Sequence, residues 1–226
     1  MNVFDRLATR YVRTLKQASV LSLSSVNFFS RIKLETLKSV WLDRPNSCKI
    51  LDFGCGVGLN IQPLVQGFCA ESIAGVDSSS QSIKEASSCN MEIDFYIDLS
   101  QVEKKKLRFD LIFCACVFHH IESEEREDVL ERLKRLLTPN GIIAVFEHNP
   151  FNPLTRLSVA LCELDRGVRL LSRRDLMELG DKVDLRVEES LYYMFFPESL
   201  YAIEKRFQFL RSIPFGAQYL TIFKAR

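Results

Sequence analysis

The sequence has no excess of charge of either sign. Thirty lysines and arginines stand against twenty-nine aspartates and glutamates, so the formal net charge of the 226 residues is +1. A chain so nearly neutral has no overall field that would attract a phosphate backbone. Nucleic acid is therefore disfavoured as a partner, although a local basic patch is still compatible with the composition.

Long hydrophobic runs are missing as well. The most apolar stretch, Val20–Phe29, is interrupted by serines and an asparagine and falls short of the ~20 residues that a membrane span needs. The segment Met1–Arg10 carries Asp5 and two arginines with no apolar run behind them, unlike a secretory signal. We therefore expect a cytoplasmic protein without a transmembrane helix.

Paired cysteines are the third absence. The seven cysteines are odd in number, scattered and mostly placed in apolar runs, which favours reduced core thiols over a disulfide framework. Cys114 and Cys116 share one face of a predicted strand, but no second pair of cysteines completes a tetrahedral zinc site. We predict no metal site.

The residues that are present indicate a single α/β fold. Hydrophobic residues make up 47% of the chain and charged residues 26%, as in ordinary globular proteins. Two helices are predicted first, Val3–Ser19 and Asn27–Leu42, and Pro45 ends that region. From Lys49 onward, short apolar runs alternate with amphipathic stretches, which is typical of βα units and a mostly parallel sheet.

Seven strands and three late helices are predicted. The strands are Lys49–Phe53, Ile73–Val76, Ile93–Ile97, Leu111–Cys116, Ile142–Phe146, Leu185–Tyr193 and Gln218–Phe223. The late helices are Leu154–Leu164, which is an insertion beside the sheet, Arg173–Leu179 and Glu198–Leu210. Ser100 to Glu103 fits a capping box, and Ser123 before four acidic residues fits a second helix start. A turn at Thr138–Gly141 is predicted immediately before the fifth strand.

Three glycines, at positions 54, 56 and 58, directly follow the first predicted strand and precede the amphipathic stretch Leu59–Phe68. Glycine permits a tight turn and close approach of a ligand to bare backbone, and the following helix start offers unpaired N–H groups. Asp52 precedes the glycines by two positions. The segment therefore predicts a site for a nucleotide-like cofactor rather than a purely structural turn.

A second acid follows at the distance that a ribose requires. Asp77 ends the second strand just over twenty residues after the glycines, where a carboxylate can accept hydrogen bonds from both ribose hydroxyls. The alternative is that Asp77 caps the next helix. Because Ser79 can serve as that cap, we favour the ribose role.

These motifs, in this order, resemble those of class I S-adenosylmethionine-dependent methyltransferases. The matching runs are Leu51-Asp52-Phe53-Gly54-Cys55-Gly56-Val57-Gly58, Gly75-Val76-Asp77, Phe109-Asp110-Leu111-Ile112 and Leu136-Leu137-Thr138-Pro139-Asn140-Gly141. The resemblance implies a Rossmann-like seven-stranded sheet of order 3-2-1-4-5-7-6 with strand seven antiparallel. It divides the single domain into an N-terminal helical cover (1–45), a cofactor-binding core (46–148), and an insertion with a substrate-side part (149–226).

The resemblance also implies S-adenosyl-L-methionine as the cofactor. Its methionine part would lie beside Asp52 and the glycines, and its ribose beside Asp77. Asp98 follows the third strand, where the family often places an acid near the adenine, although Asp98 can also be a surface acid beside a helix start. The candidate cofactor-binding residues are Asp52, Gly54, Cys55, Gly56, Asp77, Ser78, Asp98 and Cys114.

All three histidines follow strands four and five, at the carboxyl edge of the sheet where open α/β folds bind ligands. His148 ends the fifth strand before a proline corner, and we predict it as the general base, with Glu147 next because alternation turns the two to opposite faces. His120 is a weaker candidate, since it can instead anchor the backbone. His119 is predicted to be a solvated loop residue.

The run Asn149-Pro150-Phe151-Asn152-Pro153 superficially resembles a motif of nucleic-acid amino-methyltransferases. That motif belongs after strand four and has proline at the position of Phe151, so we interpret the run as a fixed corner into the insertion. We expect O-methylation of a small-molecule, glycan or lipid-linked acceptor. The alternatives are an NAD(P)-dependent reductase on a similar fold, which the glycine spacing disfavours, and a non-catalytic module that only binds the cofactor.

Overall fold

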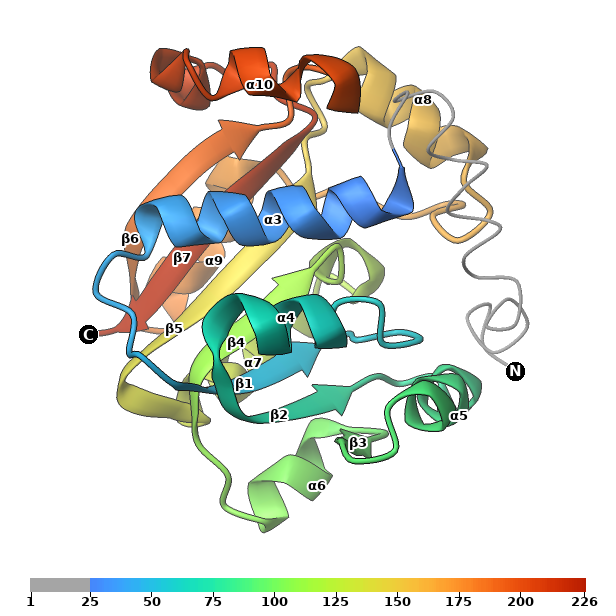
Figure 1. Cartoon of the computed structure of the whole chain (residues 1–226), viewed down its shortest axis with the longest axis vertical. Helices are drawn as coiled ribbons and strands as arrows, with labels where there is room; N and C mark the ends of the chain where they lie inside the picture. Colours follow the sequence, from blue (N-terminus) through green and yellow to red (C-terminus); the bar gives the residue numbers. More distant parts are fainter. Residues whose placement is uncertain (1–24) are drawn as a thin grey trace.

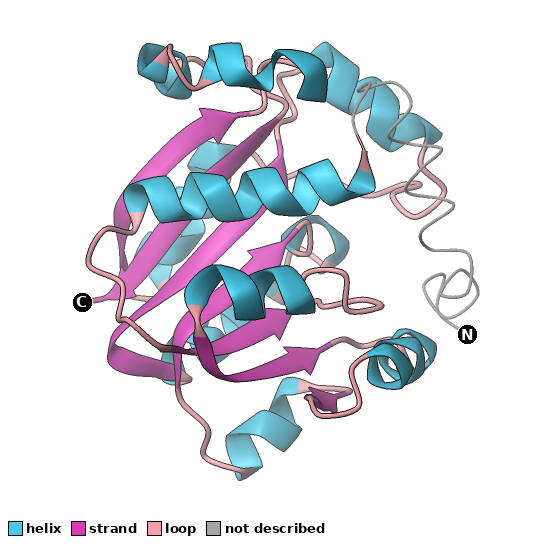
Figure 2. Cartoon of the chain, viewed as in Figure 1, coloured by secondary structure: helices cyan, strands magenta, loops and turns pink. Residues whose placement is uncertain are grey.

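The computed structural model of the chain describes residues 25–226, which form a seven-stranded sheet with helices on both faces (Figures 1 and 2). The strand order is β3-β2-β1-β4-β5-β7-β6. β7 runs antiparallel to β5 and β6, and the remaining neighbours are parallel. The predicted fold class, sheet order and antiparallel seventh strand are confirmed.

All seven predicted strands form, mostly with small changes in length. They are β1 (Cys48–Phe53), β2 (Ala70–Val76), β3 (Asp94–Tyr96), β4 (Phe109–Ala115), β5 (Leu137–His148), β6 (Leu185–Tyr193) and β7 (Gln218–Ala225). The largest difference is in β5, which starts before the predicted turn at 138–141. Phe109 pairs with Leu137 and Leu111 with Ile142, so the four turn residues form an irregularity inside the strand pairing.

Two layers of helices cover the sheet. One face carries α3 (Val26–Val40) and α4 (Ile61–Phe68), and the other carries α6 (Leu99–Lys104), α7 (Arg126–Arg135) and α9 (Arg173–Lys182). α5 (Ser80–Cys89) lies beside β3 at one edge of the sheet (Figure 1). The central strands are buried on both faces: Ile50 and Leu51 are consecutive, face opposite layers and are fully buried.

Two helix starts differ from those predicted. α6 is capped by Asp98, whose carboxylate accepts a hydrogen bond from the Ser100 backbone N–H at 2.7 Å, so Ser100 lies inside the helix and is not its cap. α7 begins at Arg126 after Glu125, which makes no side-chain capping bond, so the cap predicted at Ser123 is also wrong. Asp98 has the extended backbone conformation of an N-cap residue, and aspartate caps a helix as well as serine does. The capping-box pattern that begins at Ser100 therefore does not exclude a cap two residues earlier.

The segment after β5 forms an insertion and a broken helical region. α8 (Pro153–Leu161) is capped by Asn152 and ends three residues earlier than predicted. The single helix predicted at 198–210 is wrong, because this segment is a short α10 (Tyr201–Glu204) between 3₁₀ turns at Glu198–Leu200 and Gln208–Ser212. Its large apolar side chains, Phe207 and Phe209 among them, are exposed, so no buried stripe supports a continuous helix.

α8 and α10 lie at the same end of the molecule, at the top of the view in Figure 1. The helix predicted at Val3–Ser19 lies outside the described residues. Within residues 25–226, no helix combines the length and apolar character needed to cross a membrane.

Candidate active site

The glycine turn after β1 is held tightly against the start of the loop that follows β4. Gly54 has a φ of +72°, in the left-handed region, and a Cβ built on it would come within 2.2 Å of Cγ2 of Val117. Its N–H donates to the carbonyl of Val76 at 2.7 Å, which ties the turn to the end of β2. Only glycine satisfies both the backbone conformation and the space.

Asp52 is a buried carboxyl group without a hydrogen-bond partner among the described residues. It is fully buried at the end of β1, and neither of its oxygens meets a donor. Burial, followed by the charge of Asp77, raises the pKa of Asp52 to about 8. A buried acid left unsatisfied beside a bare-backbone turn is suited to a ligand that carries an N–H donor or a positive charge.

Asp77 lies at the end of β2 and joins the glycine turn to α5. Its two carboxylate oxygens accept hydrogen bonds from the backbone N–H groups of Gly56 and Ser79, each at 2.9 Å. Ser79 is the cap of α5, with its hydroxyl accepting from the N–H of Ser82. Asp77 is therefore not required as the helix cap, and its role toward a ribose stays a prediction.

The other predicted cofactor residues differ in their exposure to solvent. Asp98 and Ser78 are exposed, and Asp98 already caps α6. The thiols of Cys55 and Cys114 are buried in the protein, and burial raises the pKa of both. Cys55 can therefore offer a ligand its backbone in the turn more readily than its side chain. The cofactor roles of these four residues stay predictions.

The carboxylate of Glu147 contacts three residues of the loop after β4. Its Oε1 accepts hydrogen bonds from the backbone N–H groups of Val117 at 3.0 Å and Phe118 at 2.7 Å, and its Oε2 lies 2.5 Å from Nδ1 of His119. Glu147 is fully buried, and its pKa is lowered despite that burial, with the charge of His119 as the first stabilising cause. With both oxygens occupied, Glu147 positions His119.

His119 is buried, with an exposed fraction of 3%, which overturns the prediction of a solvated loop residue. Its Nε2 lies 3.5 Å from Oδ1 of Asp165, and Nε2 of His120 lies 3.2 Å from the same oxygen. Asp165 comes from the loop after α8 and was not identified in the sequence. No local signal marks it, because its partners lie more than forty residues earlier in the chain.

His148 lies on the other side of β5 from Glu147, as strand alternation predicts. Its Nδ1 is 3.4 Å from the amide nitrogen of Gln218, and its ring centroid is 5.3 Å from that of His119. Burial, followed by the nearby charge of His119, lowers the pKa of His148 to about 4. The imidazole is thus neutral at pH 7 and can accept a proton, although as a weak base.

The predicted corner after β5 is held chiefly by its asparagines. The side-chain amide of Asn149 is buried and donates to the carbonyls of Pro214 at 3.0 Å and Gly216 at 2.8 Å. Asn152 caps α8 and donates to the carbonyl of Phe215. The corner is thereby tied to the loop before β7, next to His148.

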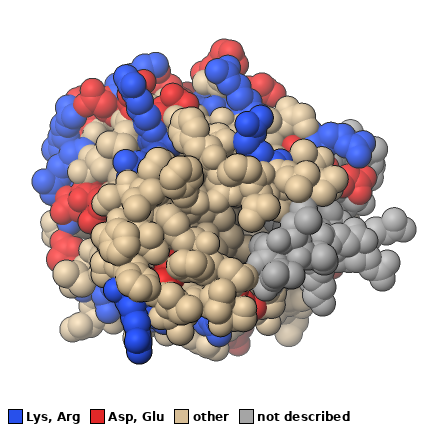
Figure 3. Space-filling view, turned by 90° about the horizontal axis from the view of Figure 1, so that it is seen from above, with Lys and Arg blue, Asp and Glu red and all other residues tan. Residues whose placement is uncertain are grey.

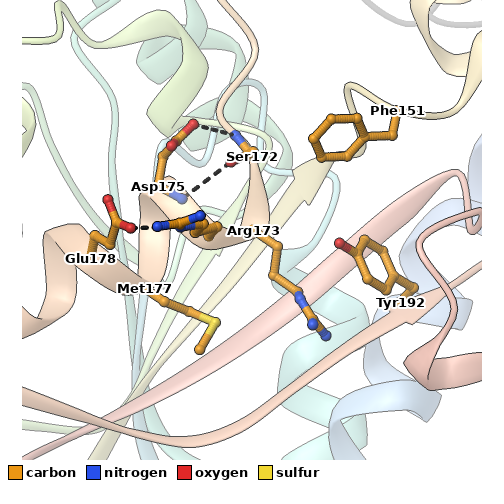
Figure 4. A pocket seen from close by; sticks show the side chains of 8 residues that line it. Phe151, Ser172, Arg173, Asp175, Met177, Glu178 and Tyr192 are labelled. Carbon is orange, nitrogen blue, oxygen red and sulfur yellow. Dashed lines mark hydrogen bonds and ion pairs between the residues drawn. The ribbon is translucent and has the colours of Figure 1, made fainter.

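A surface pocket of about 730 Å³ lies away from these groups (Figure 4). It is formed by the start of α9, by Tyr192 of β6 and by Phe151, with the guanidinium of Arg173 over the Tyr192 ring at 4.5 Å. β6 is the edge strand, and three strands separate it from β1 and the glycine turn. This pocket is therefore distinct from the candidate cofactor site.

The chain is similar to known methyltransferases over part of its length. Residues 51–143 match the family model described as a methyltransferase domain. The chain is 31% identical over 103 residues to an uncharacterised protein of Rickettsia prowazekii, a match covering 42% of this chain and 41% of that protein. It is 28% identical over 108 residues to the ubiquinone biosynthesis O-methyltransferase of Pelagibacter ubique, with 46% and 43% covered. The chain thus spans less than half the length of these curated relatives.

Solved structures resemble the chain over nearly its whole length. An S-adenosylmethionine-dependent methyltransferase from Clostridium acetobutylicum superposes with a TM-score of 0.66, with 99% of each chain covered and 13% sequence identity. At this level of identity, the likeness establishes the shared fold.

Proposed function

The chain carries a class I S-adenosylmethionine-dependent methyltransferase domain, and on this premise we propose that it transfers a methyl group to a hydroxyl oxygen of a small-molecule, glycan or lipid-linked acceptor. The observation that carries the proposal is the buried carboxyl of Asp52 beside the glycine turn, which has no hydrogen-bond partner within residues 25–226. It fits the ammonium group of the methionine part. We assign Asp77, which follows the neighbouring strand β2, to the ribose hydroxyls.

The sheet itself argues against the reductase alternative. Dinucleotide-binding sheets of the doubly-wound type run in the order 3-2-1-4-5-6 and are mostly parallel. Here an antiparallel β7 is inserted between β5 and β6. Together with the family match over residues 51–143, this leaves methyl transfer as the function that the domain supports best.

Methyl transfer needs orientation and exclusion of water more than chemical activation. S-adenosylmethionine supplies, when bound, a sulfonium methyl that is already open to nucleophilic attack. The protein therefore has to place the acceptor oxygen in line with the methyl and keep water away. We assign the acceptor side to the ends of β4 and β5, where the three histidines gather.

The acceptor class is supported by the surface around the insertion. Leu154, Leu157 and Leu161 of α8 are exposed, with exposed fractions of 64%, 47% and 66%. Viewed from above, the molecule presents a broad area in which few lysine, arginine, aspartate or glutamate side chains appear (Figure 3). An apolar or lipid-linked acceptor fits such a surface, and the O-methyltransferase name of the Pelagibacter relative agrees with an oxygen acceptor.

His148 is the proposed base for the acceptor hydroxyl. A positioned base contributes roughly 10²–10⁴-fold to such a step. With the true acceptor, His148→Gln is expected to lower turnover at least ~100-fold while cofactor affinity stays within about twofold. A small loss, or one matched by collapsed cofactor binding, would return His148 to a structural role and leave proximity as the main catalytic device.

The deciding experiment is a screen of acceptor pools with isotopically labelled methyl donor, preceded by calorimetry. Saturable binding of S-adenosylmethionine or its demethylated product is expected, with a gain in thermal stability by mass action. Binding of NAD(H) with neither sulfur cofactor would overturn the proposal. Cofactor binding with no labelled product from any pool would favour a binding module.

A further inference from the structure

A cluster of metal-ligating side chains lies beside the proposed acceptor site. His119, His120 and Asp165 each offer one ligand atom, and these atoms lie within 4.8 Å of one another. The two histidines come from the 3₁₀ turn after β4 and Asp165 from the loop after α8. The cluster therefore joins the cofactor-binding core to the insertion.

The hydrogen bonding of His119 leaves one of its ring nitrogens unsatisfied in this cluster. Glu147 accepts only, because its other oxygen already takes two backbone N–H groups, so Nδ1 of His119 carries the proton between them. Nε2, the other ring nitrogen, is buried, makes no hydrogen bond among the described residues, and faces a carboxylate oxygen of Asp165 at 3.5 Å. Against the effect of burial, Glu147 and Asp165 raise the pKa of His119, so in the metal-free protein a proton stands between this nitrogen and Asp165. A metal ion can take the place of that proton.

The distances suit a metal ion. Zn–N bonds of roughly 2.0–2.1 Å and Zn–O bonds of roughly 2.0–2.2 Å, at tetrahedral angles, separate neighbouring ligand atoms by about 3.4 Å. Oδ1 of Asp165 is 3.5 Å from Nε2 of His119 and 3.2 Å from Nε2 of His120. All three ligand atoms lie within 4.8 Å of one another, so closing on one ion requires an approach of at most about 1.4 Å for any pair.

We propose that His119, His120 and Asp165 bind a divalent transition-metal cation of the Zn²⁺ or Fe²⁺ class. Two imidazoles and one carboxylate are a common set for such ions and leave coordination positions open. Glu147 completes the arrangement from behind, since a carboxylate on the far nitrogen of a ligating histidine fixes its ring and its tautomer. The sequence prediction of no metal site considered only the cysteines and missed this set.

The proposed site adjoins a surface groove of the insertion at Asp165. Asp165 lines this groove, of about 460 Å³, with Pro150, Val159 and Val168. A bound ion would clamp the loop after α8 to the turn after β4, so that metal binding stabilises the fold. This inference does not depend on methyl transfer, because the cation site uses none of the residues assigned to the cofactor.

Cobalt is the probe for the test. The full chain is treated with EDTA, dialysed and titrated with Co²⁺, with Zn²⁺ then added as a competitor. We expect one Co²⁺ per chain with the d–d absorption of a low-coordinate site, its displacement by Zn²⁺, and a higher melting temperature with either ion. His120→Ala and Asp165→Asn, which alter partly exposed side chains, are each expected to weaken Co²⁺ binding at least tenfold.

His148→Gln is the matched control, because it removes the third histidine of the chain but none of the three ligands. It should bind Co²⁺ as the unaltered chain does. Absence of stoichiometric binding would show that a proton, and not a metal, bridges His119 and Asp165. Unchanged binding in both ligand variants would overturn the proposal, as would a thiolate-to-cobalt band, which would place the ion on the exposed Cys69 or Cys89. Cofactor calorimetry in EDTA separates this outcome from failure of the proposed function.

Discussion

At the scale of single residues, burial of the Asp52 carboxyl costs free energy, because no hydrogen bond from the described residues compensates for its lost hydration. Its pKa is about 8 in the fold, against roughly 3.9 for an exposed aspartate. Between these values the folded state keeps a proton that the unfolded state has lost. Stability of the cofactor-free protein is therefore expected to fall as the pH rises from about 4 to about 8.

Asp52→Asn tests this dependence. The free energy of unfolding of the variant should lack the pH dependence that Asp52 contributes, which is up to ~1.4 kcal/mol per pH unit. At pH 8 the variant should therefore be more stable than the unaltered chain, and it should bind the cofactor more weakly. Urea unfolding at pH 5.5 and pH 8 measures the difference. Asp98→Asn is the control, since Asp98 is exposed and its pKa is lowered, so its effect should not change across this range. Parallel profiles for Asp52→Asn and the unaltered chain would contradict the assignment.

Asp77 has two possible roles, in the ribose site and in the turn itself, and they can be separated. Asp77→Ala should weaken cofactor binding by about 1–3 kcal/mol, as expected for hydrogen bonds to a charged group. Calorimetry with a cofactor analogue that lacks both ribose hydroxyls distinguishes the roles. If Asp77 binds the ribose, the analogue binds the variant and the unaltered chain with similar affinity. If the full loss persists with the analogue, Asp77 acts through Gly56 and Ser79.

At the scale of elements, the turn after β1 and the loop after β4 depend on each other. Gly54→Ala forces a side chain into the space of Val117 and a non-glycine residue into a left-handed conformation. The conformation alone costs about 1–2 kcal/mol, and the clash adds to it. We expect lower stability and a loss of cofactor binding.

The double variant Gly54→Ala with Val117→Ala separates the free-energy cost of the clash from that of the backbone conformation. Removing the Val117 methyl groups relieves the clash but not the backbone strain, so thermal unfolding should show partial recovery relative to Gly54→Ala. No recovery would mean that the conformation of Gly54 is the whole constraint. Val117→Ala alone shows what the lost valine packing contributes.

At the scale of the whole molecule, the proposed cofactor core and the proposed cover are separate parts of one chain. Asp52 lies in β1, Gly54 in the turn after it and Asp77 directly after β2, whereas the insertion with α8 is added after β5. We therefore expect that deleting residues 1–24 spares cofactor affinity and lowers turnover. Calorimetry and the labelled-methyl assay measure the two quantities on the same preparation. Full turnover by the shortened chain would show that residues 1–24 are not part of the cover over the acceptor.

The sequence by itself determined the features that depend on neighbours along the chain. Alternating apolar runs predicted the seven strands, because a strand buried on both faces needs a continuous apolar segment. The spacing of Asp52, Gly54 and Gly56 predicted the turn, since backbone conformation there is a local property. Ser79 was correctly expected as a helix cap for the same reason.

Only the tertiary structure decided what depends on contacts between distant segments. His119 can be buried because Glu147, twenty-eight residues later, accepts a hydrogen bond from its Nδ1, and Asp165 reaches both histidines from a loop beyond α8. Local pattern also failed at α6, where Asp98 caps the helix in place of Ser100. Burial and charge pairing are set by which segments the sheet brings to one edge, and no local spacing records that arrangement.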